Sequence, residues 1–342
     1  MPFINRIKRP WLLLAVSAVL LTVVIVIAGL RAWALLNSPL ALPGSVIFDV
    51  PAGSSLGTVS DELAAQGWLE TPLLFKLWSR YSGHAGRLQA GEYELEPALT
   101  PVQLLEKLVA GDVKQYQLTL VEGWTFTQAL ETIQSSPGIA VTLGGLSAEE
   151  IAERLAFHYA NPEGQLFPDT YFYTRGTTDA EILSRAHRRL LAILEEVWAQ
   201  RLGVLPLDSP YQALILASIV EKETAVAAER PQIAGVFIRR LEQNMRLQSD
   251  PTVIYGMGER YNGNIDRAAL NEVTPYNTYR INGLPPTPIA LSGREAIIAS
   301  VNPDAGAALY FVARGDGSHQ FSATLDEHNA AVRRYQLGEN VQ

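Results

Sequence analysis

Residues 213–224 read Ala-Leu-Ile-Leu-Ala-Ser-Ile-Val-Glu-Lys-Glu-Thr, eight residues without a charge followed by a Glu-Lys-Glu end. Ser209-Pro210 stands just before them, and a capping serine followed by proline in the first turn is typical of a helix start. Counting back from Glu221 by helical steps reaches Ser218 and Leu214, so one helix face leads to this carboxylate. The stretch therefore predicts an apolar helix that holds an acid at the edge of the core.

Glu221 is the candidate acid of this helix. Desolvation disfavours the charged form of a carboxyl group, so one beside apolar walls keeps its proton to a higher pH. A carboxylic acid that is protonated near neutral pH can act as a general acid. The ordinary alternative is a solvated helix terminus. Glu223 lies two residues further on and faces away from Glu221, so we expect it to form an ion pair or to solvate the helix end.

Composition excludes several classes of function. The 342 residues favour more than one domain. A net charge of −8 argues against a nucleic-acid binder. Because cysteine is absent, no disulfide, thiolate metal site or cysteine nucleophile can form. The five histidines are scattered without ligand spacing, and the sequence has no phosphate-binding loop and no nucleophile elbow. We therefore predict no metal and no cofactor.

The N-terminus predicts a membrane anchor. Arg6, Lys8 and Arg9 precede residues 11–30, which carry no charge and would span ~30 Å as a helix. The positive flank predicts a cytoplasmic N-terminus at 1–10, a transmembrane helix at 11–36 and an exported body. A cleaved signal peptide is the alternative, but the apolar run exceeds the ~7–15 residues of a signal sequence. We therefore expect a single-pass protein of the plasma membrane.

The rest of the chain predicts an α+β protein with a tether at 37–45, a small domain at 46–113 and a larger mixed domain at 114–342. Alternation, helical periodicity and capping residues define the elements. In the small domain we expect strands at 46–50 and 90–95 and helices at 54–65, 72–81 and 100–111. In the larger domain we expect strands at 116–121, 171–173 and 308–313 and helices at 125–134, 147–160, 178–200, 209–223, 231–242 and 326–335.

Three segments are predicted as loops rich in tyrosine, asparagine, threonine and proline: 247–255, 274–279 and 283–289. Aromatic faces stack on sugar C–H surfaces, amides and hydroxyls pair with sugar hydroxyls, and prolines reduce the entropy lost on binding. Each segment alone is as readily an ordinary connection. Together, in an acidic exported body, they indicate a groove for carbohydrate or peptide.

Within the small domain, Val50-Pro-Ala-Gly-Ser-Ser-Leu56 and Leu88-Gln-Ala-Gly-Glu-Tyr-Glu-Leu95 resemble a LysM module. LysM modules bind glycans that contain N-acetylglucosamine, so the resemblance implies a wall-binding role. A spacer domain without a sugar site is an equal alternative.

A longer set of motifs resembles the endolytic murein transglycosylase family, also called YceG-like. The motifs are Glu163-Gly-Gln-Leu-Phe-Pro-Asp-Thr-Tyr171, Ala217-Ser-Ile-Val-Glu-Lys-Glu-Thr224, Leu247-Gln-Ser-Asp-Pro-Thr-Val-Ile-Tyr-Gly256, Thr274-Pro-Tyr-Asn-Thr-Tyr279, Gly283-Leu-Pro-Pro286, Asn302-Pro303, Tyr310-Phe-Val312 and His319-Gln-Phe321. The resemblance implies a peptidoglycan lyase that cleaves the β-1,4 bond from N-acetylmuramic acid to N-acetylglucosamine and leaves 1,6-anhydro-muramoyl ends. Such an enzyme terminates nascent glycan strands.

The resemblance assigns the acid/base role to Glu221. One carboxyl group suffices, because the muramoyl C6 hydroxyl acts as the internal nucleophile and replaces the second carboxylate of a retaining hydrolase. Five further residues are candidates for substrate binding. Glu163 and Asp250 would orient the acid or the sugar, and residues 276–278 would line subsites as Tyr276, Asn277 and Thr278.

The resemblance also implies an inner-membrane protein with a periplasmic catalytic body that works with glycan-polymerising penicillin-binding proteins. Two rivals stay open. A membrane-anchored glycan-binding scaffold would not require an acidic group at Glu221, and an ordinary muramidase would release reducing ends. A protease fits poorly, because no suitable serine, cysteine or histidine arrangement is evident.

Overall fold

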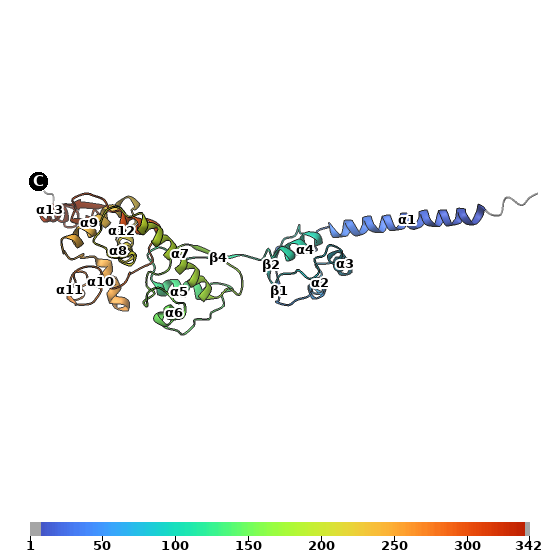
Figure 1. The fold of residues 1–342 in the computed structure, drawn as a ribbon, viewed down its shortest axis with the longest axis horizontal. Coiled ribbons are helices and arrows are strands. Elements are labelled where there is room, and N and C mark those ends of the chain that lie inside the picture. The colour runs from blue at the N-terminus through green and yellow to red at the C-terminus, as the bar shows by residue number, and fades with distance from the viewer. Residues whose placement is uncertain (1–7, 339–342) are drawn as a thin grey trace, which may run out of the picture. The chain divides into compact units, whose positions relative to one another are not determined.

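The computed structural model describes residues 8–338 as an α+β protein (Figure 1). The chain divides after Tyr116 into two compact units, close to the boundary predicted between 113 and 114. Residues 1–7, which hold most of the predicted cytoplasmic N-terminus at 1–10, lie outside the described residues.

The first unit begins with one long helix, α1 (Lys8–Leu36). Its segment Trp11–Leu36 has a mean hydropathy of 2.9, and it is long and apolar enough to cross a membrane. The apolar side chains from Trp11 to Leu30 are exposed, which in water would be costly. The helix therefore has the length and composition of a membrane span.

The remainder of the first unit is a small α/β body. Its elements are β1 (Val46–Val50), α2 (Leu56–Ala65), α3 (Pro72–Tyr81), β2 (Gly91–Leu95) and α4 (Pro101–Ala110). The predicted element order is confirmed, and β1 and β2 form an antiparallel pair in which Phe48 faces Tyr93. Local signals explain the boundaries of α4, because Thr100 forms a capping box and Gly111 ends the helix at φ 68°. The LysM-like character of this body stays a prediction.

The second unit is mainly helical, with two small strand pairs. Its elements are β3 (Tyr116–Thr119), α5 (Phe126–Ser135), α6 (Ala148–Arg154), β4 (Thr170–Tyr173), α7 (Asp179–Ala199), α8 (Pro210–Glu223), α9 (Arg230–Glu242), α10 (Asp250–Met257), α11 (Arg267–Asn271), α12 (Arg294–Val301), β5 (Tyr310–Ala313), β6 (His319–Ser322) and α13 (Leu325–Tyr335). β3 pairs with β4, and β5 pairs antiparallel with β6.

Two predictions about this unit are wrong. The helix expected over 147–160 ends at Arg154, and Ala156 adopts a left-handed φ of 52° that an α-helix does not tolerate. The region after Leu247 is not only loop, because it contains α10, α11 and α12, and β6 follows β5. These helices are eight residues or shorter and stand among prolines and glycines, so their periodicity is too short to detect.

Helix α8 lies at the centre of the second core, among α7, α9 and α12. All eight residues from Ala213 to Val220 are buried. Its one polar side chain in that run, Ser218, donates to Ile215 O and accepts from Ile289 N, so no polar group is left unpaired there. The helix is therefore buried on every side, and the predicted single face leading to Glu221 is too narrow a description.

Candidate active site

The two glutamates at the end of α8 occupy different environments. Residues two apart on a helix point about 200° away from each other, so Glu221 and Glu223 leave the core in nearly opposite directions. The sequence analysis assigned the acid role to Glu221 and an ion pair or solvation to Glu223. The hydrogen bonds and the burial of each carboxyl group indicate whether it can exchange a proton with a substrate.

The Glu221 carboxylate is held by protein on both oxygens. Oε1 accepts from Arg230 Nη2 at 3.2 Å, and Oε2 accepts from Gly293 N at 3.0 Å. Its side chain is only 5% exposed. Burial raises the pKa of Glu221, and the nearby Glu122 also raises it, whereas Gly293 and Arg230 lower it. Glu221 is thus fixed inside a charged cluster of protein groups.

Gly293 shows how tightly this cluster is built. A Cβ atom at position 293 would lie 2.0 Å from Oε1 of Glu122, so the backbone approaches as closely as only glycine allows. Arg230 also lies 3.7 Å from the Glu122 carboxylate. Two acidic groups from separate parts of the chain therefore share one arginine.

Glu223 instead belongs to the lining of a cavity of about 530 Å³. Ser249 Oγ donates to Glu223 Oε1 at 2.5 Å. Burial raises the pKa of Glu223 to about 7, and the charge of Asp250 raises it too, whereas Ser249 and Arg240 lower it. Glu223 interacts electrostatically with Arg240 in the cavity wall, and the expected ion pair or solvated helix end stays a prediction. The cavity is lined by Glu223, Arg240, Gln248, Asp250, Tyr279, Tyr310, Phe311, Val312, Ala313, His319, Leu325, His328, Asn329, Val332 and Gln336.

The charged groups of the cavity wall are held in place. Arg240 donates through Nε to Leu309 O and through Nη1 to Leu247 O, both at 2.7 Å, and its guanidinium lies 5.2 Å from the centre of the Tyr310 ring. Asp250 accepts from Tyr279 Oη at 2.7 Å. A cation, an anion and a titrating carboxyl group therefore line one cavity, as in many active sites.

Two histidines complete the wall. His328 stacks on Tyr310 with ring centres 5.2 Å apart, and its buried Nδ1 has no hydrogen-bond partner among residues 8–338. Burial and the charge of Arg240 lower the pKa of His328, so its ring is neutral near pH 7. His319 Nδ1 lies 2.7 Å from Glu229. Both histidines therefore belong to the cavity lining, and they differ in the partner of Nδ1.

The cavity edge also contains an unusual backbone conformation. Gln248 has a φ of 51°, in the left-handed region that few residues other than glycine adopt. Its N–H donates to Thr278 O at 3.2 Å. Such conformations persist where the surrounding structure determines them, and they concentrate at functional sites.

Of the five predicted binding residues, only Asp250 lines the Glu223 cavity. Asn277 and Thr278 are buried, so the structure does not support their predicted place in a subsite wall. Nδ2 of Asn277 donates to three backbone carbonyls, and Oγ1 of Thr278 accepts from Ser249 N at 3.0 Å. Thr278 therefore holds the loop whose Ser249 contacts Glu223, whereas Asn277 holds the backbone of residues 269–272.

Glu163 and Tyr276 lie among other partners. Glu163 Oε1 accepts from Phe126 N at 2.9 Å and Gly164 N at 3.1 Å, and Oε2 accepts from Tyr255 Oη at 3.2 Å. Burial raises the pKa of Glu163 to about 7. Tyr276 bonds Thr287 at 2.9 Å and packs against Tyr255. Neither residue belongs to the lining of the Glu223 cavity.

Sequence reasoning missed several residues of this wall. Gln248 and Tyr279 lie inside motifs that were identified, but their roles were not assigned. Arg240 follows a strongly apolar segment of α9, where a buried arginine is a signal that could have been noticed. His328 gave no signal, because only packing of α13 on β5 brings it to Tyr310. The wall also includes Tyr310 and His319.

Comparisons with known proteins agree on one family. The model of the YceG-like family matches residues 48–334. A protein of Bacillus subtilis (strain 168) named endolytic murein transglycosylase is 29% identical over 316 residues, which cover 86% of each chain. A protein of the same name from Streptococcus pneumoniae (D39) is 28% identical and covers 85% of this chain, which spans 58% of that protein.

A solved structure gives the same result. The crystal structure of a yceG-like protein from Listeria monocytogenes is 30% identical, with a TM-score of 0.52. The match covers 84% of this chain and 98% of the Listeria chain.

Proposed function

The chain belongs to the YceG-like family, and on that premise we propose that it is a murein lytic transglycosylase whose acid/base group is Glu223. The relatives named endolytic murein transglycosylase match 85% and 86% of this chain. The enzyme is accordingly a lyase that acts on peptidoglycan. It cleaves the β-1,4 bond between N-acetylmuramic acid and N-acetylglucosamine within glycan strands and leaves 1,6-anhydro-muramoyl ends.

The observation that carries the acid assignment is the access of Glu223 to the 530 Å³ cavity. A general acid must come within hydrogen-bond reach of the substrate atom that it protonates. Among residues 8–338, Glu223 accepts a hydrogen bond from the hydroxyl of Ser249, and it lines the cavity together with Asp250 and Arg240. Glu221 has both oxygens occupied by Arg230 and Gly293. The family resemblance assigns the acid/base role to Glu221, the first glutamate of the Glu-Lys-Glu motif, so the proposal of Glu223 departs from it and rests on the cavity alone.

The pKa of Glu223, about 7, suits a group that must both give and take a proton near neutrality. Protonated Glu223 donates its proton to the glycosidic oxygen that leaves with N-acetylglucosamine. The resulting carboxylate then removes the proton of the muramoyl C6 hydroxyl while that oxygen attacks the anomeric carbon. The C1–O bond to the leaving sugar breaks, the C1–O6 bond forms and Glu223 regains its proton. Water is neither consumed nor required.

Asp250 has a separate role in this mechanism. Tyr279 fixes its carboxylate, and its negative charge faces the same cavity as Glu223. Positive charge develops at the anomeric carbon as the glycosidic bond breaks, and a fixed carboxylate nearby stabilises it. Asp250 is proposed as this stabilising group.

The apolar helix near the N-terminus supports a proposal for where the enzyme acts. Helix α1 is proposed as a single-pass anchor of the inner membrane, with residues 1–10 cytoplasmic and both folded units periplasmic. The small domain at 46–113 is proposed as a LysM-like module, with glycan binding and a spacer role both open. Termination of nascent strands beside penicillin-binding protein synthases follows from this location.

Product analysis tests the reaction. The full chain, solubilised in detergent, is incubated with peptidoglycan, and the fragments are analysed by mass spectrometry, with Glu223→Gln as the control. Anhydro-muramoyl ends from the wild type alone are the expected result. Reducing ends would make the enzyme a hydrolase. No fragments, with binding to peptidoglycan retained, would contradict the enzyme and favour a glycan-binding scaffold.

A further inference from the structure

Helix α3 carries an apolar stripe that no protein group covers in the described part of the chain. Leu73, Leu77 and Tyr81 are 71%, 52% and 85% exposed. They recur at intervals of four residues, which places them on one side of the helix. The opposite side is a normal core face, because Phe75 and Ser79 are buried. The helix is therefore apolar toward the core and also toward its surroundings.

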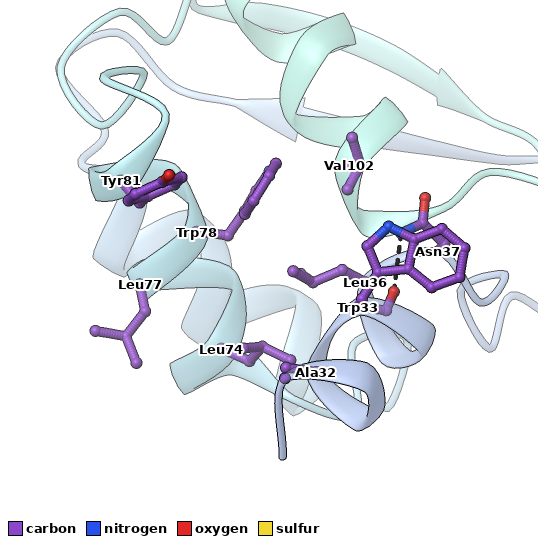
Figure 2. A pocket seen from close by; sticks show the side chains of 10 residues that line it. Ala32, Trp33, Leu36, Asn37, Leu74, Leu77, Trp78, Tyr81 and Val102 are labelled. Carbon is purple, nitrogen blue, oxygen red and sulfur yellow. Dashed lines mark hydrogen bonds between the residues drawn. The ribbon is translucent and has the colours of Figure 1, made fainter. Parts of the chain in front are cut away.

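A cavity of about 470 Å³ continues this stripe toward α1. Figure 2 shows Leu74 and Trp78 of α3 on one side of the cavity and Leu36 and Trp33 of α1 on the other. Almost all of the lining is apolar. The full lining is Gly29, Ala32, Trp33, Leu36, Asn37, Leu74, Leu77, Trp78, Tyr81 and Val102.

The position of the cavity along α1 gives its depth in a membrane. The uncharged run 11–30 spans ~30 Å, which accounts for the full hydrocarbon thickness of a bilayer. Arg31 then marks the end of the hydrocarbon region, since a long cationic side chain at a helix end extends to the interface. The α1 residues that line the cavity run from Gly29 to Leu36, and Asn37 follows directly after the helix, so the cavity begins where the hydrocarbon region ends.

The chemistry of the stripe matches that depth. Tryptophan and tyrosine concentrate at the membrane–water interface, and Trp33, Trp78 and Tyr81 all line the cavity. Helix α3 contains no acidic residue, and Arg80 is exposed next to Tyr81. An apolar face with a cationic flank is the pattern of a helix that lies in the headgroup region of a bilayer.

We propose that α3 is an interfacial helix, and that the α1–α3 cavity is occupied by phospholipid of the same bilayer that α1 crosses. The inference rests on the proposed membrane anchoring, and it adds a second contact with lipid. The occupant is lipid because residues at the end of the lipid-facing run of α1 line the cavity together with Leu77 and Tyr81 of the α3 stripe. The consequence is that the small domain lies against the membrane surface and does not move freely on its tether.

Site-directed spin labelling tests this proposal with little disturbance, because the chain has no cysteine. The full chain is reconstituted in liposomes, and a nitroxide is attached to single-cysteine variants Leu77→Cys and Leu73→Cys. Two controls are Val19→Cys, exposed in the middle of α1, and Ile47→Cys, exposed on β1 of the same small domain. Collision rates with oxygen, which enters lipid, and with a water-soluble nickel chelate are compared.

Labels at positions 77 and 73 are expected to lose most of their nickel collisions relative to position 47, while their oxygen collisions rise above those of position 47 and stay below those of position 19. Nickel access equal to that of position 47 would overturn the proposal. Protection from both reagents would also overturn it, because protein, such as a second copy, would then cover the stripe. Nickel access at position 19 would refute the anchor together with the proposal, whereas the product assay would still report the enzyme's reaction.

Discussion

Glu221 and Glu223 are separated by a single residue in the sequence, but they have different surroundings in the fold. The Glu221 side is closed, since Arg230 and the Gly293 amide occupy the carboxylate and Glu122 shares the arginine. Glu223 lines a cavity, and among residues 8–338 Ser249 is the hydrogen-bond partner of its carboxyl group. Burial raises the pKa on both sides. The pKa shift therefore does not distinguish the two carboxyl groups, whereas the cavity lining, which includes Glu223 and not Glu221, does.

The most direct test of the difference between Glu221 and Glu223 is to neutralise each carboxyl group in turn and compare the activities. Glu223→Gln is expected to lower the rate by about 10²–10⁴-fold, the usual contribution of a general acid. Glu221→Gln serves as the matched control and is expected to keep most of the activity. The measurement is the rate of anhydro-muramoyl end formation, with circular dichroism to check the fold. A larger loss from Glu221→Gln would restore the assignment made from the sequence.

The buried ion pair between Arg230 and Glu221 is expected to contribute strongly to the free energy of unfolding. Arg230→Met leaves Glu221 buried without its cation, and breaking a buried ion pair in this way costs on the order of 3 kcal/mol. The double variant Arg230→Met/Glu221→Gln removes the unpaired charge, so it is expected to recover much of the loss. Chemical denaturation of the four proteins in the cycle measures the coupling. Equal stability of the single and double variants would show that Glu221 does not depend on Arg230.

Glu163 provides a third case for the comparison of Glu221 with Glu223, because its carboxyl group has a raised pKa but does not line the Glu223 cavity. Its folded pKa, about 7, lies above the ordinary value of 4.5, so the folded state binds the proton more tightly than the unfolded state. The contribution of Glu163 to the free energy of unfolding is therefore present at low pH. It is lost as the pH rises from about 4.5 to 7, and it amounts to at most about 3 kcal/mol.

Glu163→Gln keeps acceptors for the Phe126 and Gly164 amides and removes the charge. Thermal unfolding at pH 5 and pH 8 is expected to show a smaller loss of stability in this variant than in the wild type. Glu223 titrates in the same range in both proteins, so the difference between them reports Glu163. Equal losses would mean that Glu163 is not the titrating group.

The smallest expected effect is a shift of the pH profile. Glu223 must be protonated to act as the acid, so the rate should fall as pH rises above about 7. Ser249 lowers the pKa of Glu223 through its hydrogen bond. Ser249→Ala is expected to move the alkaline limb to higher pH by a fraction of a unit. Profiles of kcat/KM from pH 5 to 9 measure it, and a shift to lower pH would contradict the assignment.

The element boundaries were largely predictable because their causes are local. Thr100 and Thr178 form capping boxes where the sequence predicted helix starts, and Ser209 caps α8 in front of Pro210. Helix α1 was equally evident, because a long uncharged run needs no tertiary context to be recognised. The short helices α10 to α12 were missed, since tertiary packing rather than periodicity stabilises them.

The sequence by itself determined that a buried helix ends in Glu-Lys-Glu, that the chain carries one apolar anchor, and which family its motifs resemble. Only the tertiary structure decided which glutamate faces the cavity. All of residues 213–220 are buried, so no apolar face distinguishes the two directions in which Glu221 and Glu223 leave the helix. Their settings come from Arg230, Gly293 and Ser249, which lie elsewhere in the chain and meet α8 only when the second core packs around it.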